Sequence, residues 1–309
     1  MKVLVLLNSG AGAGAAKGAS RAAEIHEAFA LHGIEAKISI TAGNEISSAA
    51  REALDMRQSG AGKAYDALVV AGGDGSISAA AAVLAGSDFP LAILPLGTLN
   101  HFARDLGLPL DLAGAVEAIA AQNIRKVDVG ELNGRVFVNN SSIGLYPFMV
   151  ASRNAGQAKF GLSKMLATIP ALAQTLTRAA WRQLDISFSG QRQRLRTPCI
   201  FVGNNTYETG VDRFGMRNRL DGGILSVFIV RQQTRLGLML LPFKIALNLA
   251  NRTRDIDTFN ASEFEIFSRR AKVRVAMDGE LATFRSPLRY RIRPGALCVV
   301  GPLPVADAP

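Results

Sequence analysis

The residues from Ala67 to Ala103 constrain the fold more than any other part of the sequence. An apolar run, Ala67–Ala71, has the length of a buried parallel strand, and the residues GGDGS follow it directly at 72–76. The alanine-rich segment Ile77–Leu84 predicts a helix. A second apolar run, Leu91–Leu94, ends in the residues PLGTLN. This order of strand, glycine turn, helix and strand is typical of a doubly wound α/β sheet.

The glycine turn has the composition of a phosphate-binding loop. Gly72, Gly73 and Gly75 allow the backbone to approach an anion, and the N–H groups at a helix start, here near Ser76, point toward it. Asp74 would repel a phosphate, so its expected role is to hold the Mg²⁺ that accompanies a nucleoside triphosphate. The alternative is that the glycines form only a tight turn between strand and helix.

Polar residues also follow the neighbouring apolar runs. The runs Lys2–Leu7 and Glu35–Ile40 predict two further strands, which end at Asn8 and Thr41. Thr98, like the glycine turn, comes just after a predicted strand, and ligands of parallel sheets bind where the strands end. We therefore expect Thr98, and Asn100 beside it, to complete the phosphate pocket.

The composition limits the class of partner. The chain has 309 residues, 49% of them hydrophobic, which is enough for two domains with sizeable cores. A formal net charge of +10 indicates an anionic partner. Aromatic residues make up only 6% and no nucleic-acid motif is evident, so nucleic acid is disfavoured. Cys199 and Cys298 lie far apart in apolar runs and are expected to be reduced thiols of a cytosolic protein.

The character of the sequence changes near Gly130. We expect residues 1–130 to form the α/β domain, with a return of the chain at about 295–309, and residues 131–294 to form a β-rich domain. The strands expected in the β-rich domain are Arg135 to Asn139, Gln183 to Phe188, Leu195 to Val202, Leu225 to Val230, Glu263 to Phe267 and Lys272 to Met277.

Two segments within the β-rich region are expected to be helices. Phe160–Trp181 and Leu236–Arg252 combine apolar faces with flanking Lys and Arg, a pattern that suits an anionic membrane surface. The alternative is that both helices pack on the β domain with their charges solvated. No stretch has the length of a transmembrane helix, so the sequence predicts a protein that is soluble or lies on a membrane surface.

Taken as a set, the GGDGS and PLGTLN motifs resemble the signature of the diacylglycerol kinase catalytic domain family, which includes bacterial lipid kinases and the sphingosine and ceramide kinases. The resemblance extends from Asn8 to the MDGE stretch at 277–280. It implies an NAD kinase/diacylglycerol kinase-like α/β domain followed by an antiparallel β-sandwich. It also implies ATP and Mg²⁺ as cofactors and a lipid hydroxyl as phosphate acceptor.

The resemblance also implies roles for individual residues. Asn8 and Thr41 would contact the nucleotide, and Asp128 would lie near the active cleft and help to organise Mg²⁺. Glu280 would be the general base that takes the proton from the lipid hydroxyl, with Asp278 as its neighbour. Without the resemblance, the Asp-Gly pair before Glu280 predicts only a hairpin turn.

Three positions depart from the family pattern. Ser9 stands where proline is usual, and His101 stands where much of the family has an aspartate. Gly222 occupies the position of a metal-binding aspartate, and Asp221 lies one residue away, so Asp221 is a weaker candidate for a structural metal site.

The sequence therefore favours an ATP-dependent lipid kinase that acts on a diacylglycerol-like hydroxyl at the cytosolic face of a membrane. Alternatives are an NAD kinase, a nucleotide- or lipid-binding protein that has lost catalysis, and, last, a nucleic-acid binder. The identity of the lipid, the phosphate donor and the oligomeric state, including a homodimer, stay open.

Overall fold

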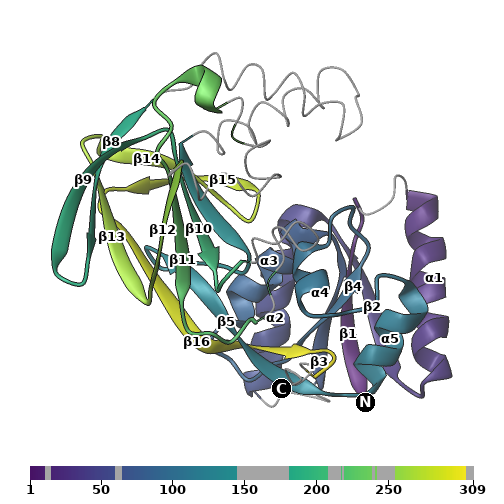
Figure 1. The fold of residues 1–309 in the computed structure, drawn as a ribbon. Coiled ribbons are helices and arrows are strands. Elements are labelled where there is room, and N and C mark those ends of the chain that lie inside the picture. The colour runs from purple at the N-terminus through teal and green to yellow at the C-terminus, as the bar shows by residue number, and fades with distance from the viewer. Residues whose placement is uncertain are drawn as a thin grey trace, which may run out of the picture. The chain divides into compact units, whose positions relative to one another are not determined.

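The computed structural model describes residues 1–10, 15–59, 65–144, 181–207, 217, 219–238, 241 and 255–303 (Figure 1). The chain forms two compact units. The first comprises Met1–Val129, Arg219–Asp221 and Arg293–Pro309, and the second comprises Gly130–Asn218 and Gly222–Ile292. The helices expected at Phe160–Trp181 and Leu236–Arg252 lie almost wholly outside the described residues.

The first unit contains a parallel sheet in the strand order β2-β1-β3-β4. Its strands are β1 (Lys2–Asn8), β2 (Glu35–Thr41), β3 (Ala67–Gly72) and β4 (Leu91–Pro95). The last part of β16 (Leu288–Val300) lies parallel to β4, where Val299 is opposite Leu91. Every residue of β3 and β4 is buried, as expected of strands covered on both faces.

Helices cover both faces of this sheet (Figure 1). On one face, Phe29 of α1 and Ile119 of α5 pack with Val5 of β1. On the other face, α2 packs beside α3. The helices are α1 (Ala15–Leu31), α2 (Ile46–Ser59), α3 (Asp74–Leu84), α4 (His101–Asp105) and α5 (Leu112–Ala120), and a 3₁₀ turn, η1, spans Gly43–Glu45. No helix among the described residues is long and apolar enough to cross a membrane.

The second unit is a β-sandwich. One sheet has the order β12-β11-β10-β7-β14-β15, and the other continues from β16 through β13 and β8 to β9. Side chains from both sheets, such as Val202, Val275, Ile266 and Tyr290, share one hydrophobic core. The strands are β5 (Ile124–Leu132), which begins in the first unit, β6 (Arg135–Phe137), β7 (Asn140–Gly144), β8 (Arg182–Phe188), β9 (Gln191–Thr197), β10 (Cys199–Asn204), β11 (Leu225–Val230), β12 (Ile256–Ala261), β13 (Glu263–Ser268), β14 (Lys272–Met277) and β15 (Glu280–Arg285).

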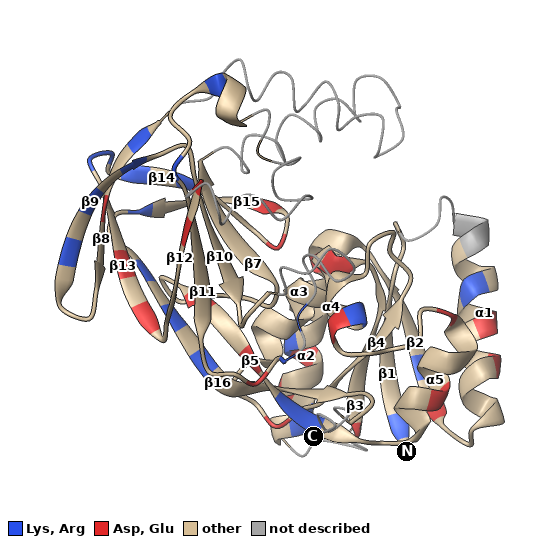
Figure 2. Ribbon diagram, viewed as in Figure 1, with Lys and Arg blue, Asp and Glu red and all other residues tan. Residues whose placement is uncertain are grey.

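Basic residues recur on several strands of the second unit. Figure 2 shows Lys and Arg on β9, β14 and β16. On β9 and β16 they alternate with other residues, as expected of strands with one face in the core and one in solvent.

The expected fold class, a parallel α/β domain followed by an antiparallel β domain, is confirmed. One expected strand is corrected, because Leu195–Val202 is divided between β9 and β10, which belong to different sheets. Pro198 separates them and lacks the N–H that a sheet interior requires. The Thr197 hydroxyl also bonds to the carbonyl of Val230 at 2.7 Å and accepts from the Cys199 N–H at 3.1 Å.

We expect the central strands of the first unit to dominate its stability. Ile93 of β4 is fully buried, whereas Ile40 of β2 is 51% exposed. Ile93→Ala should lower the free energy of unfolding by about 2–5 kcal/mol, and Ile40→Ala by about 0.5 kcal/mol or less. Urea denaturation followed by circular dichroism would measure both, and equal losses would contradict this account of the sheet.

Candidate active site

The strand register of the first unit brings the predicted phosphate-binding residues to one edge of the sheet. Asn8 is paired with Thr41, and Gly72 with Pro95, so β1, β2, β3 and β4 end side by side. The Asn8 side-chain Nδ2 donates a hydrogen bond to the Ser76 hydroxyl at 2.7 Å. The turn after β1 is therefore tied directly to the first turn of α3.

Two glycines approach each other closely in the loops that follow β3 and β4. A Cβ atom added to Gly97 would lie 2.6 Å from the Cα of Gly73 and 2.6 Å from the Asn100 Oδ1. One added to Gly72 would lie 2.9 Å from the Ser76 hydroxyl. The backbones of the two loops thus meet where no side chain fits, beside the start of α3. Gly73 is the N-cap of α3 and provides no capping side chain, so the helix N-terminus suits an anion.

Asn100 shapes the loop that follows β4. It is buried, with φ of 51°, and its Nδ2 donates to the carbonyls of Pro95 and Gly97, both at 3.1 Å. Its Oδ1 is buried without a hydrogen-bond partner. Thr98 is exposed within the same loop. Asn100 therefore supports the loop from beneath, while Thr98 and Leu99 of the loop are exposed to solvent.

Asp74 links α3 to α4. Its carboxylate Oδ1 accepts a long hydrogen bond, 3.4 Å, from the N–H of Phe102. His101, which replaces the aspartate usual in the family, is exposed at the first position of α4, directly before Phe102. His101 is thus adjacent in sequence to Phe102, whose N–H contacts Asp74.

Asp128 lies near the amino ends of the parallel strands, opposite the ends where the glycine turn lies. Its Oδ1 accepts a hydrogen bond from the Gly295 N–H at 2.8 Å, and the carbonyl of Ala296 accepts from the N–H of Gly86. Gly86 follows the end of α3 and precedes β4, whereas Asp74 begins α3. An 11-residue helix is about 16 Å long. Asp128 is thus placed at the amino ends of the strands, away from Asp74.

Asp221 lies near Asp128 rather than near Asp74. The carbonyl of Leu220 accepts from the Asp128 N–H at 2.7 Å, and the Asp221 carboxylate forms an exposed ion pair with Arg219 at 3.1 Å. Within the described residues, no three His, Cys, Asp or Glu side chains gather to hold a metal ion. The structure therefore does not bring together the three aspartates expected to bind metal.

Asp278 closes a hairpin in the second unit. Asp278 and Gly279, with φ of 47° and 84°, form the two-residue turn between β14 and β15, with Met277 paired to Glu280. The Asp278 carboxylate accepts hydrogen bonds at 2.8–3.0 Å from three consecutive N–H groups, those of residues 138–140. These bonds lock the position from which Glu280 projects.

Glu280 is exposed and paired with an arginine. Its side chain is 60% exposed, and one carboxylate oxygen lies 3.2 Å from an Nη atom of Arg135. The sequence alone does not point to Arg135, because the two residues are 145 positions apart and only the pairing of strands brings them together.

A buried arginine binds the same segment that Asp278 holds, and the sequence alone does not point to it. The Arg217 guanidinium donates to the carbonyl of Val138 at 2.7 Å and to the side-chain oxygen of Asn139 at 2.8 Å. The Asn204 amide also donates to the Val138 carbonyl. Arg217 and Asp278 thus bind one short segment from two directions. The nearest motif in the sequence is the Asn-Asn pair at 204–205, and it does not predict that Arg217 binds this segment.

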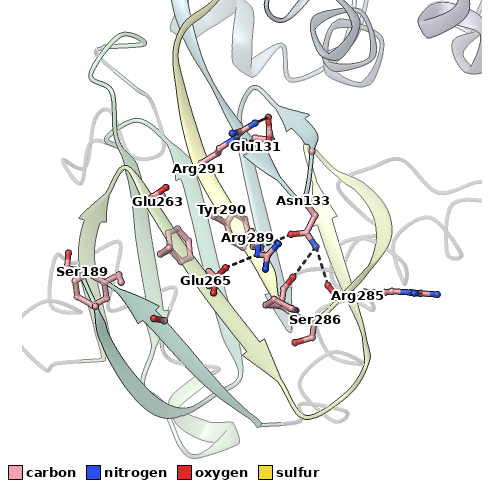
Figure 3. A pocket seen from close by; sticks show the side chains of 16 residues that line it. Glu131, Asn133, Ser189, Glu263, Glu265, Arg285, Ser286, Arg289, Tyr290 and Arg291 are labelled. Atoms are coloured by element: carbon pink, nitrogen blue, oxygen red, sulfur yellow. Dashed lines mark hydrogen bonds and ion pairs between the residues drawn. The ribbon is translucent and has the colours of Figure 1, made fainter.

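A pocket of the second unit lies apart from Asp278 and Glu280 (Figure 3). It has a volume of about 850 Å³ and lies over β13 and β16. Its charged side chains are largely paired with one another, since Arg291 binds Glu131 through two hydrogen bonds and Arg289 binds Glu265 at 2.8 Å. Neither Asp278 nor Glu280 lines it, so this pocket is not the predicted catalytic site.

Comparison with known families covers nearly the whole chain. Residues 2–132 match the diacylglycerol kinase catalytic domain, and residues 149–301 match the YegS C-terminal NAD kinase beta sandwich-like domain. Residues 2–132 therefore belong to the diacylglycerol kinase catalytic domain family. The two matches correspond to the α/β and β-sandwich architectures described above.

Curated relatives include the probable lipid kinase YegS-like of Pseudomonas aeruginosa PAO1, which is 34% identical over 174 residues, 54% of this chain and 55% of that protein. A diacylglycerol kinase of Staphylococcus aureus JH9 is 27% identical over 170 residues, 54% of this chain and 53% of that protein. The chain thus spans about half the length of the curated relatives it matches.

The fold also matches a solved structure. The crystal structure of a diacylglycerol kinase from Bacillus anthracis strain Sterne has 20% sequence identity, covers 97% of each chain and has a TM-score of 0.67. At this identity the match shows a shared fold.

The Gly73–Gly97 approach yields a test with a matched control. Gly97→Ala should weaken binding of ATP with Mg²⁺ by about tenfold or more and destabilise the protein by about 1–3 kcal/mol, because its Cβ displaces the loop. Gly18→Ala, in open space on α1, should leave ATP affinity unchanged. Calorimetry would compare them, and unchanged affinity in Gly97→Ala would contradict the placement of the phosphates here.

Proposed function

We propose that this protein is an ATP-dependent lipid kinase that transfers the γ-phosphate of ATP to a diacylglycerol-like hydroxyl. The observation that carries the proposal is the close approach of Gly73 and Gly97 at the start of α3, in a domain of the diacylglycerol kinase catalytic family. Bare backbone beside a helix N-terminus binds phosphate well, because the N–H groups point outward and no side chain blocks the anion.

The first unit would hold the nucleotide. Gly72, Gly73, Gly75 and Ser76 would contact its phosphates through the turn and the start of α3. Asn8 and Thr41 end the two strands beside this turn, and Thr98 is exposed on the next loop. We assign all three to the nucleotide pocket, with Asn100 as the support of the Thr98 loop.

The residues present fit a magnesium ion that is shared with the nucleotide. Mg²⁺ is usually held by one or two carboxylates, with substrate phosphates and water as its other ligands. Asp74 supplies such a carboxylate at the phosphate-binding turn. When bound, Mg²⁺ would neutralise charge on the phosphoryl group during transfer. Asp128 and Asp221, near the opposite edge of the sheet, would take no part in this ion.

The second unit would supply the base. The lipid hydroxyl oxygen forms a bond to the γ-phosphorus, the bond from that phosphorus to the β–γ bridging oxygen breaks, and ADP leaves. Glu280 accepts the hydroxyl proton. Asp278 holds the turn before Glu280, and Arg135 fixes the direction of the Glu280 carboxylate before substrate binds.

The lipid substrate places the reaction at a membrane surface, which we infer to be the cytosolic face. Support comes from the net charge of +10, since an anionic leaflet attracts basic proteins. The relative from Pseudomonas aeruginosa is named a probable lipid kinase, and the one from Staphylococcus aureus a diacylglycerol kinase.

One observation favours a second candidate function, nucleotide binding without phosphate transfer. His101 stands beside the Asp74–Phe102 contact, where the family pattern has an aspartate. A neutral imidazole supplies no negative charge to a magnesium shell. A protein of this kind would bind ATP and leave lipids unlabelled.

The test is transfer of labelled γ-phosphate from ATP and Mg²⁺ to an extracted membrane lipid mixture, with products separated by chromatography. Asp74→Asn and Glu280→Gln should each lower the rate by about 10²-fold or more, because each removes a group that acts in the transfer. Glu280→Gln should keep its affinity for ATP, which calorimetry would show.

Glu265→Gln is the matched control. Glu265 lies in the same unit and is also paired with an arginine, Arg289, so the substitution makes the same change of charge. Its rate should equal that of the wild type. Bound ATP with no labelled lipid in any extract would instead support the second candidate, and equal activity in Glu280→Gln would remove Glu280 as the base.

A further inference from the structure

The connection between β13 and β14 concentrates positive charge. Within the seven residues from Ser268 to Arg274 there are four cations and no acid. These cations are Arg269, Arg270, Lys272 and Arg274, and all four are exposed. The connection carries the chain from one sheet of the sandwich to the other.

Arg182, the first residue of β8, lies beside this connection. The pairing of β13 with β8 ends at Ser268 and Leu184, and two residues beyond this end the two segments reach Arg270 and Arg182. The Arg182 side chain is half-buried, and its Nε atom is buried without a hydrogen-bond partner. A buried donor without a partner carries a free-energy penalty that a ligand acceptor would remove.

Three of these arginines, Arg182, Arg270 and Arg274, lack acidic partners among the described residues. None of the three forms an ion pair there, although nearby Arg192 and Arg194 of β9 both pair with Asp185. Burial lowers the pKa of the Arg182 guanidinium, and the positive charges of Arg270 and Arg274 lower it further. The three arginines therefore repel one another.

The surrounding sequence adds no compensating charge. From Glu131 the next acidic residue is Asp185, so the 53 residues 132–184 that lead up to β8 contain no Asp or Glu. Arginine stays protonated in proteins, so this repulsion is relieved by an anion rather than by loss of a proton. The guanidinium fork matches the oxygens of phosphate and of carboxylate, and a phosphate group carries the larger negative charge.

We propose that Arg182, Arg270 and Arg274 form a binding site for one phosphate group, carried by a phospholipid head group or by a soluble phosphate compound. The site lies wholly in the second unit and does not depend on the proposed kinase activity. It differs from the nucleotide pocket, which the first unit would form.

The chain contains its own reporter for this site. Trp181 is the only tryptophan and directly precedes Arg182. Its indole N–H donates to the carbonyl of Gln232 at 2.7 Å, and the Arg196 guanidinium lies 5.9 Å from its ring centroid. Tryptophan fluorescence of the full chain can therefore be followed while a ligand is added. The probes are inorganic phosphate, with sodium chloride keeping the ionic strength constant, and phosphatidylcholine vesicles with or without phosphatidic acid.

We expect a saturable change in fluorescence with phosphate, with phosphatidic acid vesicles, or with both. Arg182→Gln should weaken the binding by about tenfold, and the exposed pair Arg270→Gln and Arg274→Gln by more. Arg194→Gln makes the same change of charge on neighbouring β9 and should bind as the wild type does.

The two probes separate the sources of the phosphate. A response to vesicles alone assigns the site to a lipid head group, and a response to inorganic phosphate assigns it to a phosphate group in general. If neither probe changes the fluorescence beyond sodium chloride, or if Arg194→Gln weakens binding as much as Arg182→Gln, the proposal is overturned. The exposed double variant keeps the test valid if Arg182→Gln unfolds.

Discussion

The contact of two backbones at Gly73 and Gly97 is the constraint on which the first unit depends. The parallel register of β3 and β4 ends both strands at the same level; β3 is followed directly by Gly73, and β4 by Leu96 and then Gly97. Because neither glycine has a side chain, the loops close together and leave the start of α3 open. Asn8, bonded to Ser76, and Asn100, bonded beneath the second loop, hold this arrangement from either side.

In the second unit, charged side chains rather than glycines fix the position of the proposed site residue. There a single carboxylate, Asp278, gathers three successive N–H groups, and the buried guanidinium of Arg217 binds the carbonyl of the same segment. Both interactions are charge-assisted, and such bonds are stronger than neutral ones. A rigid turn results, and it presents Glu280 to solvent with its carboxylate held by Arg135.

The parts of this structure that depend on local pattern could be predicted from the sequence. Buried parallel strands appear as unbroken apolar runs, so β3, β4 and the loops that follow them could be located. The separation of Asp74 from Asp128 could not be predicted, because it depends on β5 and β16 running together near the far edge of the sheet. The Glu280–Arg135 pair and the division of Leu195–Val202 likewise arise from strand pairing between distant segments.

The most direct test of the central claim is amide hydrogen exchange with and without ATP and Mg²⁺. We expect protection of residues 72–76 and 97–100, where bound phosphates would shield the two glycine loops. The amides at 138–140, already bonded to Asp278, should change little. Unchanged exchange at both glycine loops while ATP is bound would contradict the account.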